Sequence, residues 1–333
     1  MLELISIYLV LNTLIYINFN KISKLINILD KPDNKLKRHK INTPLLGGVI
    51  MLFNLIIFFL LQPFFEYRII ELNISYRNYF SIIFFILAFF LLGIIDDKHA
   101  LKPEKKIFLM IFFSIISFTL NNDLIISDFS FSFYEKRIFL NDFKYIFTIF
   151  CVLILINSLN FYDGINAQSI IFFIFCFSYL AYKSPIYNFY IIIILVLIFI
   201  LFLNLLNKCF MGDNGIFLLG SILIIAIIYE YNIFETINYS DEIFLLLILP
   251  GYDLVRLTST RVIRNKNAFY GDRNHIHHLL NNKFSLLNTN LILFFLSIIP
   301  IFLYSVINLN FFVVLTIFTI TYIFVIYRAK SND

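Results

Sequence analysis

Charged residues are scarce in this chain of 333 residues. Asp, Glu, Lys and Arg make up 14% of it and hydrophobic residues 60%, against roughly 25% and 45–50% in soluble globular proteins. This shortage of charge excludes an ordinary soluble domain. Tryptophan is absent while phenylalanine and isoleucine abound, which indicates an AT-rich genome rather than a function for aromatic stripes.

Cysteine is also rare, and its placement excludes further kinds of site. Cys151, Cys176 and Cys209 lie in or beside apolar runs without metal-ligand spacing, so they indicate core thiols and no disulfide framework. The sequence has no CxxC pair, no Ser-His-Asp set and no dinucleotide-binding glycine fingerprint. It also lacks tandem repeats and low-complexity linkers, so we expect a single integral domain over residues 1–333.

Long apolar segments dominate the chain instead. A segment of roughly 17–25 residues can span a hydrocarbon core about 30 Å thick. Such segments lie at 2–20, 44–62, 78–95, 105–121, 144–160, 165–182, 186–204, 215–232, 243–259, 287–306 and 309–327. The predicted fold is an all-α integral membrane protein, a bundle of about eleven transmembrane helices with cytoplasmic active-site loops. Lysines follow the first segment rather than precede it, so we expect a retained helix and not a cleaved signal.

The loops between these segments differ in charge. One set carries nearly all the lysines and arginines. The other set has only Arg68, Arg77, Lys136, Arg137, Lys144 and Lys183. Because cytoplasmic loops are enriched in Lys and Arg, we expect the N-terminus outside and the C-terminus inside a bacterial cytoplasmic (inner) membrane. The net charge of +5 then reflects topology and not nucleic acid binding. One outer loop, 121–142, alternates apolar and polar residues and predicts a short hairpin.

Every unusual polar cluster falls in the cytoplasmic set of loops. The clusters read DDKHALKPEKK, NSLNFYDGINA, MGDNG and RLTSTRVIRNKNAFYGDRNHIHHLL. A charge inside the bilayer costs at least ~2.5 kcal/mol, so acids at its edge indicate a function. Their segregation to one side predicts one active site assembled from several helix ends.

Asp96 and Asp97 open the first cluster. Neighbouring residues of a helix do not share a face, so one of the two is expected to contact the reacting groups and the other a cation or a supporting residue. Pro103 suits the first turn of the next helix. The alternative interpretation is a charged helix end among lipid headgroups.

Two clusters offer oxygen ligands. Asn157, Asn160 and Asp163 follow at steps of three, which lines them along one side of a helix. Amide and carboxylate oxygens suit a hard cation such as Mg²⁺. Asp213 in MGDNG stands at a helix start, whose free N–H groups suit phosphate, while its carboxylate can hold the metal. Interhelical hydrogen bonds by the asparagines and simple capping by Asp213 remain alternatives.

The last cytoplasmic loop is rich in cations. It contributes Arg256, Arg261, Arg264, Lys266, Arg273, His275, His277 and His278. Catalytic zinc sites draw spaced ligands from a fixed scaffold, whereas these histidines are crowded, so contact with a sugar or diphosphate fits better. Anchoring at the cytoplasmic side is the alternative for several of the arginines. Far upstream, Gly47 and Gly48 of PLLGG permit close approach of another backbone.

These groups match the needs of a diphosphate bound with a metal ion. Two phosphates with about two negative charges each, ~4 Å apart at an effective dielectric near 20, repel by on the order of 16 kcal/mol. Mg²⁺ and basic side chains offset that repulsion and orient the reacting groups. A site at the membrane edge indicates that one substrate is a lipid.

The same motifs resemble those of a known family. The chain shows DDxxxLxPxxK from Asp96 to Lys106, NxxNxxDG from Asn157, then GDNG and DRNHIHHLL, with PLLGG upstream. Over residues 30–280 these resemble the polyprenyl-phosphate N-acetylhexosamine-1-phosphate transferases, glycosyltransferase family 4, and the GlcNAc branch more than the peptidoglycan branch. The resemblance implies Mg²⁺-dependent transfer of a sugar 1-phosphate from a UDP-amino sugar to undecaprenyl phosphate, with release of UMP.

The resemblance also implies roles. Asp96 or Asp97 would deprotonate or orient the lipid phosphate, and Asp163 would serve the nucleotide end of the site. Asn160 and Asp213 would hold Mg²⁺, or Mn²⁺ in its place. The substrate-binding residues would be Lys106, Asn157, Arg261, Arg264, His275, His277 and His278. The chain departs from the family pattern at DGINAQ, where Asn166 replaces an acid and Ala167 a glycine, a change that fits a different amino sugar.

Two other functions stay open. A transporter would place charged or helix-breaking residues near mid-membrane, whereas these segments are largely free of ionisable residues. An isoprenoid-diphosphate enzyme using the acid pair would need a second acid-rich repeat, which the sequence lacks. A homodimer, the UDP-sugar and the final glycan are likewise open.

Overall fold

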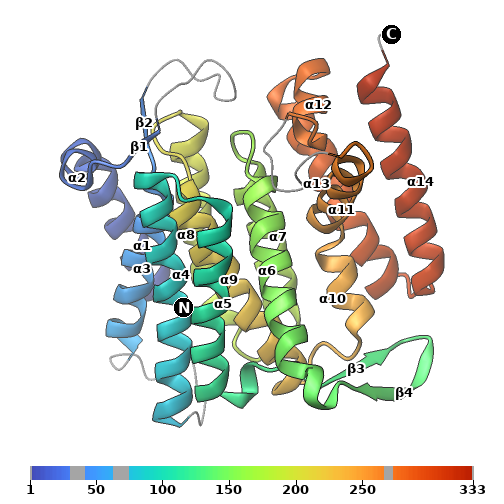
Figure 1. Ribbon diagram of the computed structural model, residues 1–333. Helices are drawn as coiled ribbons and strands as arrows, with labels where there is room; N and C mark the ends of the chain where they lie inside the picture. Colours follow the sequence, from blue (N-terminus) through green and yellow to red (C-terminus); the bar gives the residue numbers. More distant parts are fainter. Residues whose placement is uncertain (1, 31–41, 63–74, 266–272, 332–333) are drawn as a thin grey trace.

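The computed structural model describes residues 2–30, 42–62, 75–265 and 273–331 (Figure 1). Each predicted apolar segment coincides with a helix or with a bent pair of helices. The first helices are α1 (Leu2–Ile17), α2 (Phe19–Ile26), α3 (Gly47–Leu61), α4 (Tyr76–His99), α5 (Pro103–Leu120) and α6 (Lys144–Tyr162). The later ones are α7 (Gln168–Lys183), α8 (Tyr187–Leu205), α9 (Gly212–Asn232), α10 (Ser240–Leu246), α11 (Ile248–Ile263), α12 (Ile276–Lys283), α13 (Leu286–Ser305) and α14 (Phe311–Lys330).

Six of the described helices are long and apolar enough to cross a membrane, and bent pairs raise that number to eight if each counts as one span. The pairs are α1–α2, bent by 68°, and α10–α11, bent by 76°. Two more apolar helices, α3 and α7, have only 15 and 16 residues, and α5 begins with the charged run Glu104 to Lys106. A multi-pass, all-α membrane protein is thus confirmed, whereas the predicted number of about eleven spans is not.

α9 is the central helix of the bundle. In its apolar stretch of 18 residues 89% of the residues are buried, against 22–44% in the corresponding stretches of the other five long helices. It packs against α3, α4, α6 and α7. Gly93 lets α4 approach closely, because a Cβ there would lie 2.5 Å from the Cα of Asn214. Any motif at the start of α9 is therefore surrounded by the ends of other helices.

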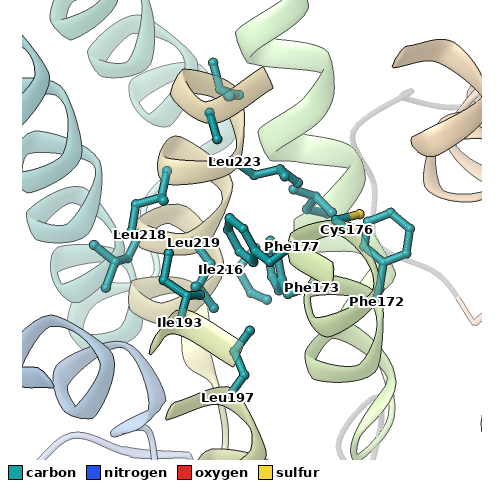
Figure 2. Close-up of a cluster of buried hydrophobic side chains, with 14 of the residues drawn as sticks. Phe172, Phe173, Cys176, Phe177, Ile193, Leu197, Ile216, Leu218, Leu219 and Leu223 are labelled. Atoms are coloured by element: carbon teal, nitrogen blue, oxygen red, sulfur yellow. The ribbon is translucent and has the colours of Figure 1, made fainter. Parts of the chain in front are cut away.

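Close packing of large side chains holds the middle of the bundle together. Figure 2 shows Phe173 and Phe177 of α7 facing α9, with Ile193 and Leu197 of α8 beside them, and all four are fully buried. The two phenylalanine rings are 6.3 Å apart. Since lipid tails are as apolar as these side chains, dispersion contacts and tight fit, rather than transfer out of water, favour this packing.

The two ends of the bundle carry different structures (Figure 1). One end holds α2, α12 and the short antiparallel pair β1 (Leu29–Asp30) and β2 (Thr43–Pro44). The other holds the hairpin of β3 (Asp128–Phe131) and β4 (Tyr134–Phe139), which confirms the hairpin predicted within 121–142. We call them the inner end and the outer end, after the expected orientation in the membrane.

Candidate active site

The inner end is built on a contact between PLLGG and MGDNG. The N–H of Phe210 donates to the carbonyl of Pro44 at 2.9 Å, and the N–H of Gly47 donates to the carbonyl of Phe210 at 3.1 Å. A Cβ on Gly48 would lie 2.5 Å from the backbone nitrogen of Gly215. The predicted close approach of another backbone to these glycines is confirmed, and it places the start of α3 against the start of α9.

Asp97 caps the N-terminus of α9. Its Oδ1 accepts from the N–H of Asp213 at 2.9 Å, and its Oδ2 accepts from the N–H of Asn214 at 3.0 Å. Gly212, with φ of +70°, makes the preceding turn. A carboxylate is favoured here because a helix start presents unpaired donors and partial positive charge. Two of the N–H groups that were expected to be free for phosphate at this helix start are therefore occupied by an acid of α4.

Asp96 contacts a different set of groups. Its Oδ1 accepts from the N–H of Leu101 at 2.8 Å, which closes the turn after α4. Its carboxyl forms an ion pair with Lys106, and the Nζ of Lys106 also lies 3.4 Å from Oδ2 of Asp213. The carboxyls of Asp96 and Asp213 are thus brought close together on either side of one ammonium. The two neighbouring acids of α4 thus serve different partners, as their helical spacing predicts.

The pair of Asp96 and Asp213 fits a divalent cation. Two carboxylates in contact repel unless a proton or a cation compensates them, and here the ammonium of Lys106 supplies positive charge to both. The Asp213 side chain stays 29% exposed, so the pair remains accessible. In the described ranges no three His, Cys, Asp or Glu side chains surround one metal position. Further ligands would come from amides, water or substrate phosphates, which is the usual pattern for Mg²⁺.

Asp163 ends α6 within the electrostatic reach of this cluster. Burial, and then the negative charges of Asp97 and Asp30, raise its pKa to about 6. The hydroxyl of Ser169 donates to its Oδ1 and acts in the opposite direction on that pKa. The sequence motifs around Asp97, Asp163 and Asp213 are therefore brought together at the inner end.

The two asparagines of the same motif differ in their hydrogen bonds. The Nδ2 of Asn157 donates to the carbonyl of Leu153 at 2.7 Å, inside its own helix. Asn160 is half-buried in the last turn of α6, and its side chain makes no hydrogen bond to another described residue. The roles of Asn157 in substrate binding and of Asn160 in metal binding stay predictions.

Asn166, where the family pattern has an acid, belongs to a network of amides. Its Nδ2 donates to Oδ1 of Asn207 at 2.6 Å, and Asn204 accepts from the N–H of Ala167 at 2.7 Å. The Nδ2 of Asn290 donates to the carbonyl of Asn166 at 3.0 Å. A carboxylate at position 166 has no proton to donate to Asn207, so the amide suits this network. The network joins the α6–α7 turn to α13 and to the loop before α9.

His277 packs against the turn that follows α6. It is 1% exposed, and its Nδ1 lies 3.2 Å from Nε2 of Gln168. A Cβ on Gly164 would come within 1.8 Å of Nε2 of His277, so the glycine is required by this contact. Burial, and then the neighbouring His278 and His275, lower the pKa of His277 well below its ordinary range. His277 is therefore a neutral group beside Asp163.

The remaining cations divide between the site and the surface. Arg261 is 4% exposed, with its guanidinium 5.9 Å from the ring centroid of Phe161. Arg264 is exposed at the end of α11. His278 packs edge-on against His277, with ring centroids 4.2 Å apart. Lys266 lies outside the described residues. The structure thus brings Arg261 and the histidines to the inner end and leaves Arg264 at its margin.

Asp253 was missed by reasoning from the sequence. It lies in α11, its side chain is 3% exposed, and its Oδ2 accepts from Nδ1 of His275. A signal was available, because Asp253 is the one acid within the predicted apolar segment 243–259, and an ionisable residue in such a segment indicates a functional position.

Comparisons with known proteins point to one family. Residues 79–230, which include Asp96, Asp97, Asp163 and Asp213, match the family described as glycosyl transferase family 4. The undecaprenyl-phosphate alpha-N-acetylglucosaminyl 1-phosphate transferase of Escherichia coli O157:H7 is 28% identical over 84% of this chain and 75% of its own length. Proteins of the same name from Yersinia pestis and Thermotoga maritima are each 27% identical, over 84% and 81% of this chain and 76% and 79% of theirs.

Proposed function

We propose that this chain, whose residues 79–230 match glycosyl transferase family 4, is a phosphotransferase that transfers an N-acetylhexosamine 1-phosphate from a UDP-sugar to undecaprenyl phosphate. One observation carries the proposal. The side chains of Asp96, Lys106 and Asp213, from α4, α5 and α9, meet at the inner end beside Asp97. Such a cluster of acids with one ammonium is what two phosphates and a cation require.

In the proposed reaction an oxygen of the lipid phosphate attacks the phosphorus that carries the sugar. The bond between the two phosphates of the UDP-sugar breaks, and UMP leaves with the electron pair. The product is a lipid diphosphate sugar, so the number of phosphates is conserved. The chain contributes mainly orientation and charge compensation, which is the general pattern for phosphoryl transfer.

The described contacts support distinct roles for the acids. Asp97 fixes the start of α9 and thereby the place of Asp213. Asp213, with Asp96 beside it and Asn160 on α6, would hold Mg²⁺ or Mn²⁺, and the bound ion would screen the negative charge of the phosphates. Lys106, which lies between the two carboxyls, would contact a phosphate.

The donor is expected on the side of Asp163 and the histidines. Asp163 would serve the nucleotide, and Arg261 with His275, His277 and His278 would bind the sugar diphosphate. The location that accompanies this proposal is a bacterial cytoplasmic membrane, with the inner end facing the cytoplasm.

The decisive experiment measures UMP release by the purified protein in nanodiscs. Undecaprenyl phosphate and Mg²⁺ are combined in turn with UDP-GlcNAc, UDP-GalNAc and UDP-linked deoxy amino sugars. We expect release with at least one donor, dependent on the acceptor and abolished by EDTA. Absence of release with every amino sugar would overturn the proposal, and release without the acceptor would indicate hydrolysis instead.

A further inference from the structure

We propose that Asp253 is a positioning residue of the active site, which holds the His275 imidazole in one tautomer and one orientation toward the donor. That donor-facing role rests on the proposed function, whereas the geometry is independent of it. Asp253 lies in α11, the second helix of the bent pair, and His275 immediately precedes α12. The two residues are joined across the loop that carries the histidine motif.

Both oxygens of Asp253 face donors only. Its Oδ2 accepts from Nδ1 of His275 at 2.8 Å. Its Oδ1 accepts from Arg256 at 2.6 Å, from the hydroxyl of Tyr322 at 2.9 Å, and from the N–H of Ile276 at 3.3 Å. With its side chain only 3% exposed, the carboxylate depends on these donors in place of water. An ionised acid accepts from all four at once, which a protonated acid does not.

These contacts decide which nitrogen of His275 carries a proton. Because Asp253 acts as an acceptor, Nδ1 of His275 must donate. Nε2 is then an acceptor in the neutral ring and a second donor in the charged one. A carboxylate that fixes the tautomer and direction of a histidine is a general device of metal sites and catalytic sites.

Asp253 and Arg256 together fix three consecutive residues of the histidine loop. Arg256 donates to the carbonyl of Asn274 at 2.7 Å, and Asp253 binds the ring of His275 and the N–H of Ile276. Side chain and backbone are therefore held at once. A pair that served only to join helices would not need to bind the imidazole and both flanking backbone groups.

The oriented ring continues into the groups expected to bind the donor. His275 is stacked with His277, at 5.4 Å between centroids and 12° between planes, and its centroid is 5.6 Å from that of Phe161. The guanidinium of Arg261 lies over the same Phe161 ring, 5.9 Å from its centroid. Rotation of His275 would therefore disturb both His277 and the Arg261–Phe161 contact.

The test compares Asp253→Asn with a matched control, Asp241→Asn. Asp241 belongs to α10 of the same bent pair, is fully buried, and accepts from Ser132 and Tyr304 at the outer end. We expect Asp253→Asn to raise the KM for the UDP-sugar about 10- to 100-fold, by analogy with the loss caused by removing a residue that orients a metal-ligating histidine. The KM for undecaprenyl phosphate is expected to be unchanged, and both KM values are expected to be unchanged in Asp241→Asn.

A second measurement does not depend on activity. In ¹⁵N-histidine-labelled protein, with the signal assigned by a His275→Gln sample, His275 should show the Nδ1-protonated form in the wild type. That signal should change in Asp253→Asn and persist in Asp241→Asn and in Tyr322→Phe, which removes one donor to Asp253 without touching the ring.

These measurements test separately whether Asp253 positions His275 and whether His275 serves the donor. An Nε2-protonated His275 in the wild type overturns the positioning role, even if Asp253→Asn fails to fold. An altered His275 signal with an unchanged donor KM overturns the link to the donor. If the wild type releases no UMP with any sugar while the signal still depends on Asp253, the proposed function fails and the positioning of the ring stands.

Discussion

Two groups of acids lie at opposite ends of the bundle, and their surroundings differ. Asp213 and Glu230 stand near the two ends of α9, about 25 Å apart at a rise of 1.5 Å per residue. At the inner end Asp96 and Asp213 lie close together and share the ammonium of Lys106. Their charges are only partly compensated by the protein, which leaves a place for a cation and for phosphates.

The outer acids are compensated by hydroxyl groups and by one ammonium. Glu230 accepts from the hydroxyls of Tyr190 at 2.7 Å and Thr236 at 2.5 Å. Glu242 accepts from the hydroxyl of Tyr179 at 2.6 Å and pairs with Lys183. Both glutamates are buried, at 0% and 4% exposure. An acid whose oxygens are occupied by nearby donors stabilises the structure, whereas acids held against one another are suited to binding cations. These outer acids were not singled out from the sequence.

The largest expected effect is at Asp213. Replacing it by Asn removes one carboxylate of the crowded pair, and we expect kcat to fall by about 10²–10³, the loss seen when one electrostatic stabiliser of a transition state is removed. The protein should still insert and purify. The control on the same helix is Glu230→Gln at the outer end, for which kcat should be within about twofold of the wild type. Full activity of Asp213→Asn would refute its assignment as a metal ligand.

The second prediction concerns Glu242. Glu242→Gln leaves the ammonium of Lys183 without its carboxylate, and that side chain is 21% exposed. Breaking a buried pair costs roughly 3–5 kcal/mol, and partial solvation reduces the expected loss to about 1–3 kcal/mol. Thermal unfolding in detergent should show a lower Tm with kcat unchanged at permissive temperature. A loss of kcat as large as in Asp213→Asn would abolish the distinction between the two ends.

The third prediction uses pH. The pKa of Asp163 is raised to about 6, so the folded protein binds this proton more tightly than the unfolded chain. Its contribution to stability is therefore present at low pH and lost as pH rises from about 4, the ordinary value, through about 6. If the carboxylate serves the donor, kcat/KM should rise with pH through the same range.

Ser169→Ala tests the cause of that pH dependence. The variant removes the hydrogen bond that favours the ionised carboxyl, so the midpoint of the kcat/KM profile should move to higher pH. Asp163→Asn should abolish the rise of kcat/KM with pH in this range. A midpoint that stays in place in Ser169→Ala would assign the titration to another group.

The smallest expected effect is at Ala167. Its φ is +71°, a left-handed conformation that glycine, the residue of the family pattern, adopts without strain. Ala167→Gly relieves the backbone strain of the folded state, but it also gives the unfolded chain more conformational freedom. We expect the net effect to stabilise the protein by about 0.5–1 kcal/mol. Unfolding in detergent measures it, with Ala226→Gly inside α9 as the control expected to destabilise. Lower stability of Ala167→Gly would show that the alanine methyl is needed for packing.

Much of the fold was predictable because it follows from local pattern. Apolar runs located the long helices but not the short α2 and α12, alternation located the hairpin, and Pro103 marked the first residue of α5. The inner acids were recognisable because charge beside an apolar run is costly. The glycine contacts of Gly48 were also predicted, since absence of a side chain permits backbone approach.

The partners of the site residues were less predictable. The N–H groups at the start of α9 were expected to meet phosphate, but Asp97, more than a hundred residues earlier, occupies two of them. The spacing of Asn157 did not reveal that its Nδ2 donates to the carbonyl of Leu153 within its own helix. The partners of Asp253 could not be predicted, because nothing in its neighbourhood along the chain reveals His275 or Tyr322.

The amino-acid sequence by itself determined which segments are compatible with lipid and which carry charge, because hydrophobicity and charge belong to each residue wherever it lies. Only the tertiary structure decided which acids share a cation, which are saturated by hydroxyls and which histidine is held by a carboxylate. Those properties depend on distances of a few ångströms between helices far apart in the chain, and the energy of a charge or hydrogen bond in a membrane protein is set at that range.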